Sequence, residues 1–218
     1  MQLSEKQKYW TWTGLILVGI AGLTLVGPAE KSLGSNVRVV YLHGAWVWAS
    51  LAGFVAAGIA GLLGLLRRGP ALLGWSRALG RCGLFFWITY LPISIWAMQT
   101  NWNGLFLAEP RFRLAVIFSV AGLLLQLGVT LLEHPKWAAA GNAGFVLVLL
   151  AALRLTPNVM HPPAPILNSE ALRIQGFFAA LLLFTLALAW QIARWFYQFE
   201  RSPERQRAAP PQTALPAR

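Results

Sequence analysis

Charged residues are scarce in this chain of 218 residues: they make up 11% of it, and aspartate is absent. A soluble domain usually carries about 25% charged residues. Hydrophobic residues account for 57% of the chain. Water cannot solvate a surface of this composition, so lipid must cover much of it. The sequence therefore predicts an integral membrane protein, and the even spread of its apolar segments favours one membrane domain.

Cysteine is nearly absent, and several catalytic motifs are missing. Cys82 is the single cysteine, and no Cys-x-x-Cys-His sequence is present, which excludes a c-type cytochrome and an iron–sulfur protein. No Gly-x-x-x-x-Gly-Lys motif is present to bind nucleotide phosphates. Without aspartate, few acids can pair with a histidine in acid–base catalysis. We therefore expect a protein that is not an enzyme.

Six apolar segments approach the length of about 20 residues that a membrane-spanning helix needs. They cover residues 10–26, 39–66, 82–98, 114–132, 137–153 and 174–197. The segment after Arg201 is rich in Pro, Ala, Gln and Arg, a composition typical of disorder. The predicted fold is therefore all-α: a polytopic integral membrane bundle of six transmembrane helices in residues 1–200, followed by a disordered tail in residues 201–218.

The net charge of +11 has an asymmetric distribution that predicts the orientation in the membrane. With the N-terminus inside, twelve basic residues fall on the inner side: Lys6, Lys8, Arg67, Arg68, Arg77, Arg81, Lys136, Arg194, Arg201, Arg205, Arg207 and Arg218. Six fall on the outer side: Lys31, Arg38, Arg111, Arg113, Arg154 and Arg173. Cytoplasmic loops carry the excess of Lys and Arg, so both termini are predicted to be cytoplasmic. This placement also explains the basic charge without nucleic-acid binding.

Two of the three histidines then fall on the predicted outer face. His43 lies near the outer end of the second span, and His161 lies in the loop between the fifth and sixth spans. The predicted outer loop 99–104 adds a tryptophan and two asparagines. His134 falls on the inner face. The sequence thus predicts that His43, His161 and this polar loop share one side of the membrane.

Such a set of residues can hold haem. Two imidazoles on one face can ligate haem iron axially. Aromatic side chains near the outer ends of the second and third spans could pack on the macrocycle: Trp46, Trp96 and Trp102. Outer arginines could bind its propionates: Arg38, Arg111 and Arg113. The plainer interpretation treats the histidines as interfacial anchors, the tryptophans as an aromatic belt and the arginines as charges that reach the membrane surface.

The layout resembles a known family, the CcmC-like haem-handling membrane proteins of cytochrome c maturation. Residues 40–46 (VYLHGAW) are similar to that family's first histidine motif, and residues 160–166 (MHPPAPI) are similar to its second. Its tryptophan-rich segment corresponds to the part of this chain that holds Trp96, Asn101, Trp102, Asn103 and Gly104. The resemblance extends over about residues 10–198.

The resemblance implies a bacterial inner-membrane protein that carries haem in c-type cytochrome biogenesis. It implies that His43 and His161 ligate the iron of a transiently bound b-type haem at the outer face. The implied partners are haem, the lipid bilayer and other cytochrome c assembly proteins, with an ABC transporter as a candidate.

Two alternatives remain open at this stage. The first is a structural or assembly subunit of a respiratory or photosynthetic membrane complex, in which the histidines are interface anchors. The second is a small-molecule transporter, which would need polar groups at mid-membrane depth. The spans offer few such groups beyond Gln126 and Thr130.

Overall fold

The computed structural model describes residues 4–159, 165–166, 168 and 170–208, and its regular elements are all α-helices. They are α1 (Glu5–Val26), α2 (Val37–Arg67), α3 (Pro70–Trp102), α4 (Pro110–Leu131), α5 (Pro135–Leu155) and α6 (Leu172–Ala208). In the described part of the chain, extended pairing is limited to an isolated bridge between Glu30 and Gly34. The predicted all-α class with six helices is confirmed.

Proline and left-handed residues define many of the helix ends. α3, α4 and α5 each begin at a proline, whose fixed φ suits the first helical position and whose missing N–H costs nothing there. α2 and α3 end before Arg68 and Asn103, which have φ angles of 53° and 50°. A left-handed residue at this position is a common helix terminator. The resulting short connections make α2 and α3, α3 and α4, and α4 and α5 antiparallel neighbours.

Every helix contains a segment that is long and apolar enough to cross a membrane, with lengths from 21 to 33 residues. Large apolar side chains point outward from several helices, among them Val18, Leu124 and Leu183. Lipid would solvate these side chains, whereas water would not. The chain is therefore a multi-pass membrane protein.

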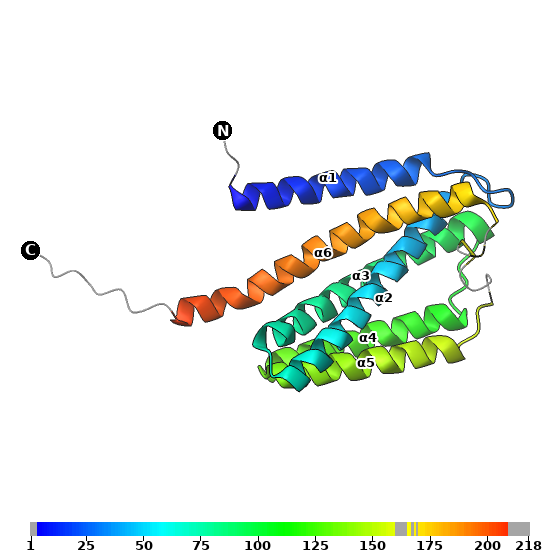
Figure 1. The fold of residues 1–218 in the computed structure, drawn as a ribbon. Helices are drawn as coiled ribbons and strands as arrows, with labels where there is room; N and C mark the ends of the chain where they lie inside the picture. The colour runs from blue at the N-terminus through cyan, green and yellow to red at the C-terminus, as the bar shows by residue number, and fades with distance from the viewer. Residues whose placement is uncertain (1–3, 160–164, 167, 169, 209–218) are drawn as a thin grey trace, which may run out of the picture.

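The central element of the bundle is the antiparallel pair α2 and α3 (Figure 1). α1 and α6 lie on one side of this pair, and α4 and α5 lie on the other. Two apolar cores match this division: one contains Tyr41, Phe86 and Phe178, and the other contains Trp87 and Leu149. The ends of α1, α3 and α5 and the starts of α2, α4 and α6 share one end of the bundle, here named the His43 end, and the start of α1 and the end of α6 lie toward the opposite end.

Glycines let α2 and α3 approach to backbone contact. A Cβ atom added to Gly53 would lie 2.9 Å from the Cα of Gly83 and 3.0 Å from its backbone nitrogen. Next to this contact, the hydroxyl of Ser50 donates a hydrogen bond of 2.8 Å to the carbonyl oxygen of Gly83. Small residues have this role where helices associate in lipid, because close packing replaces the hydrophobic effect as the driving force.

α3 and α6 extend furthest beyond the predicted spans. α3 begins at Pro70 rather than near Cys82, and it ends at Trp102, so residues 99–102 belong to a helix rather than to the predicted loop. Arg77 and Arg81 lower the hydropathy of its first turns without interrupting the helix. α6 continues to Ala208, so the first eight residues of the segment predicted to be disordered are helical.

Candidate functional site

A cavity of about 890 Å³ opens at the His43 end of the bundle. We name it the wide cavity. Side chains of α2 and α3 form much of its wall. Residues from the ends of α4, α5 and α6, from the α1–α2 connection and from the described part of the α5–α6 connection add to it. Small-molecule sites typically have volumes of about 300–1,000 Å³, so this cavity is large enough for a sizeable ligand.

The helical periodicity of α2 decides which of its side chains reach the wide cavity. Val40, Gly44, Val47 and Leu51 line it at spacings of three or four residues, and His43 and Trp48 lie beside this stripe. Gly44 leaves this part of the wall without a side chain. A Cβ atom added there would lie 3.3 Å from the ring of Phe178 on α6.

His43 lies on the wall of the wide cavity and is half-buried. Its ring meets the ring of Tyr90 at 65°, with the two centroids 5.5 Å apart. This edge contact holds the imidazole between α2 and α3. An imidazole at a cavity wall can ligate a metal ion or a haem iron.

Trp46, which the sequence placed with His43, does not line the wide cavity. Its indole N–H donates a hydrogen bond of 3.1 Å to the hydroxyl of Thr89, and its ring lies 5.3 Å from that of Phe86. Trp46 therefore joins α2 to α3 rather than forming a wall for a ligand. Trp48, two residues further on, lines the cavity instead.

The wall from α3 is largely aromatic and apolar. Trp87, Tyr90, Ser94 and Trp102 all line the wide cavity. Trp87 is fixed, because it is 1% exposed and its indole N–H donates a hydrogen bond of 3.1 Å to the carbonyl oxygen of Ala115. The sequence reasoning missed Trp48, Trp87 and Tyr90. Helical spacing from Trp102 would have found Tyr90 and Trp87, and the spacing of four residues from Gly44 would have found Trp48.

Trp96 lies elsewhere. It is on the last turns of α3, is 54% exposed and does not line the wide cavity. Of the three predicted tryptophans, the structure therefore brings only Trp102 together with His43. An exposed indole near the end of a membrane-spanning helix is typical of the aromatic belt at the membrane surface.

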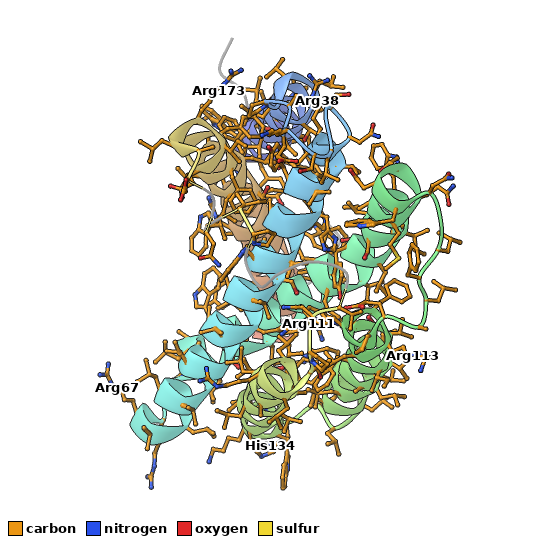
Figure 2. The ribbon with its side chains drawn as sticks, turned by 90° about the vertical axis from the view of Figure 1, so that its right-hand side faces the viewer. Arg38, Arg67, Arg111, Arg113, His134 and Arg173 are labelled. Carbon is orange, nitrogen blue, oxygen red and sulfur yellow. The ribbon has the colours of Figure 1, made fainter. Side chains whose placement is uncertain are left out.

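The three predicted arginines have three different environments (Figure 2). Arg111 lines the wide cavity, and its guanidinium donates to the carbonyl oxygens of Leu153 at 2.8 Å and Thr156 at 3.1 and 3.2 Å. These carbonyls belong to the end of α5, where a helix has no backbone donors of its own left to satisfy them. Arg38 donates to the carbonyl oxygen of Gly27 at 2.9 Å. Neither Arg38 nor Arg113 lines the cavity.

Charges of both signs surround the wide cavity. Arg111 and Arg154 supply guanidinium groups, and Glu30 and Glu109 supply carboxylates. The backbone N–H of Leu33 is the main cause that holds the pKa of Glu30 below its ordinary value. One carboxylate oxygen of Glu109 accepts a bond of 3.4 Å from the N–H of Val159, and the other is buried without a hydrogen-bond partner among the described residues.

His161 lies outside the described residues, so its position relative to His43 is not part of the structure. The described residues nearest to it on the chain that line the wide cavity are Asn158 on one side and Pro165 and Ile166 on the other. Within the described residues, no group of three or more His, Cys, Asp or Glu side chains could hold a metal ion.

No protein-family model matches this chain, and no curated protein matches its sequence. The chemistry of the site therefore has to be argued from its own residues.

Proposed function

We propose that this protein binds haem in the wide cavity and carries it in the maturation of c-type cytochromes. The observation that supports this most strongly is the position of His43, on the wall of a cavity of about 890 Å³ whose other walls include Trp48, Trp87 and Trp102. A flat apolar macrocycle fits between indole faces, and the imidazole offers an axial ligand to its iron. The family resemblance of the two histidine motifs points the same way.

The propionates of haem need cationic partners, and the cavity offers two. Nε and Nη2 of Arg111 donate to the end of α5, which leaves Nη1 without a hydrogen bond to the described residues. Arg154 is exposed and lines the same cavity. A guanidinium binds carboxylates through paired N–H groups. Arg111 therefore stays a candidate for propionate binding, and Arg154 takes the place of Arg38 and Arg113.

The proposal includes an orientation. Both termini would be cytoplasmic, as the excess of Lys and Arg favours, and the His43 end would face the outside of the bacterial inner membrane. Haem would then be released to an acceptor on that side, with other cytochrome c assembly proteins as partners. Haem is cargo in this proposal, and the protein performs no covalent catalysis.

A second candidate function is a structural subunit of a membrane complex. It draws support from the hydrogen bonds that several predicted site residues make to the bundle itself, namely Arg38, Trp46 and Arg111. In that case the aromatic wall of the cavity would contact a partner helix, and substitution of His43 would change complex assembly without changing haem content.

The first test is a haem titration of the purified protein, followed by the Soret absorption band. We expect a Soret band that saturates with the wild-type protein. His43→Ala should lower the affinity at least about tenfold, since changing even an outer-shell partner of a metal ligand has effects of that size. The matched control is His134→Ala, because His134 caps the start of α5 at the α4–α5 connection, which lies at the opposite end of the bundle (Figure 1). Equal affinities of the two variants would contradict the proposal.

A further inference from the structure

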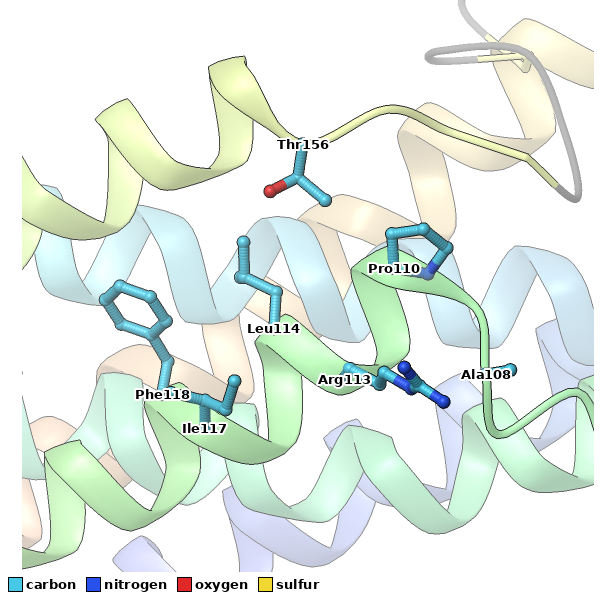
Figure 3. Close-up of a pocket in the computed structure, with 7 residues that line it drawn as sticks. All are labelled: Ala108, Pro110, Arg113, Leu114, Ile117, Phe118 and Thr156. Carbon is cyan, nitrogen blue, oxygen red and sulfur yellow. The ribbon is translucent and has the colours of Figure 1, made fainter.

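A second concavity lies at the His43 end, on the outer flank of α4. It has a volume of about 400 Å³ and is lined by Ala108, Pro110, Arg113, Leu114, Ile117, Phe118 and Thr156. Figure 3 shows Leu114 on α4, Ile117 and Phe118 one turn further along the helix, and Thr156 at the end of α5. We name this concavity the α4 groove. Its floor is apolar, and one guanidinium stands at its end.

The α4 groove is separate from the wide cavity, because the two share no lining residue. The first turn of α4 divides them: Arg111 lines the wide cavity and Arg113 lines the groove. Figure 2 shows Arg111 near the middle of this end of the bundle and Arg113 at its edge. A ligand of the groove would therefore approach from the membrane, not through the haem site.

The charge of Arg113 has no counterpart among the residues that the structure describes. Its side chain is exposed, and it makes no hydrogen bond or ion pair with the described residues. Glu109, the nearest acid in sequence, lines the wide cavity and binds the N–H of Val159. Arg113 is the fourth residue of a helix that spans the membrane, so it lies at the depth of the lipid headgroups.

The apolar side chains continue the groove toward the membrane interior. Ile117 is 63% exposed, and it lies about 6 Å further along the helix axis than Arg113. Beyond it, Val120 and Leu124 are exposed on the same helix. The order of groups is thus a cation at headgroup depth followed by an open apolar track, which matches a phosphate followed by an acyl chain.

We propose that the α4 groove binds an anionic phospholipid. The phosphate pairs with the guanidinium of Arg113, and one acyl chain lies along Leu114, Ile117 and Phe118. Charge complementarity selects the anionic lipid over a zwitterionic one, because the free guanidinium adds a favourable interaction with a net negative headgroup.

Native mass spectrometry of the detergent-purified protein tests this proposal. Phosphatidylglycerol and phosphatidylcholine with identical acyl chains would be titrated separately, and the wild type should bind phosphatidylglycerol more tightly. Arg113→Gln should lower that preference about fivefold, the size expected for one basic residue near a membrane surface. Arg113→Lys should keep the preference. Both variants should fold, because the side chain is exposed and makes no internal bond.

The matched control is Arg173→Gln, an exposed arginine at the same end of the bundle that lines neither concavity. This variant should keep the wild-type preference. Equal losses in Arg113→Gln and Arg173→Gln would mean diffuse surface charge and would overturn the proposal. So would a wild type without preference, or displacement of the lipid by millimolar inorganic phosphate, which would identify a simple anion site.

Discussion

Replacing Gly53 by valine is expected to prevent stable packing of α2 against α3. A side chain at this position would meet the Cα and the backbone nitrogen of Gly83 within about 3.0 Å. Neither atom can rotate away, so the two helices would have to separate along the bundle's central pair. Overpacking of a side chain against side chains usually costs about 1–3 kcal/mol. Contact with backbone should cost at least about 3 kcal/mol, because no rotamer relieves it.

Size-exclusion chromatography after a temperature series would measure this effect as the loss of the monodisperse peak. The control is Gly144→Val on α5, because a side chain at Gly144 would meet nothing within 4 Å. Both variants add the same β-branched residue to a membrane-spanning helix, so the difference between them reports packing alone. Equal stability of Gly53→Val and Gly144→Val would contradict the backbone contact between α2 and α3 at Gly53 and Gly83.

The second large effect concerns a polar network buried within the bundle. Asn142 on α5 accepts a hydrogen bond of 2.9 Å from the side-chain amide of Gln126 on α4 and donates at 2.9 Å to the carbonyl oxygen of Ser76 on α3. The Ser76 hydroxyl donates in turn to the carbonyl oxygen of Ala57 on α2. One side chain therefore links the α4–α5 side of the bundle to the central pair.

Asn142→Ala should destabilise the protein by about 2 kcal/mol. The change leaves the Gln126 amide and the Ser76 carbonyl without these partners in a region that lipid surrounds, where a buried polar group left unpaired costs about 1–3 kcal/mol. Unfolding in mixed micelles of increasing SDS fraction would measure it. Ser119→Ala is the control, because the Ser119 hydroxyl bonds only within its own helix, to Ala115. Equal stabilities of the two variants would contradict the proposed role of the network.

The spans were predictable from sequence, because lipid demands a long apolar segment wherever a helix crosses it. The positions of the helix ends were harder to predict. α3 begins at Pro70, twelve residues before the predicted span, because its backbone hydrogen bonds continue past the charged Arg77 and Arg81. Hydropathy detects the membrane, whereas proline and left-handed residues determine where the helix itself begins and ends.

The candidate site was predictable only in part. His43 could be placed at the bundle end from hydropathy and charge, and it lines the wide cavity. The prediction of Trp46 followed from its position one helical turn after His43. In the structure its hydrogen bond to Thr89 on α3 holds its ring between the two helices, away from the cavity wall. Arg111 and Arg113 line different concavities, because Arg111 hydrogen-bonds to the carbonyl oxygens at the end of α5. The sequence around the two arginines does not reveal where α5 ends in space.

In the proposed function, the imidazole of His43 ligates haem iron at the wall of the wide cavity. The most direct measurement is the Soret spectrum of haem-loaded His43→Ala before and after addition of free imidazole. We expect the variant to lose the wild-type band and imidazole to restore it, because the truncated side chain leaves room for the added ring beside Tyr90. A wild-type spectrum in the variant without imidazole would contradict the claim.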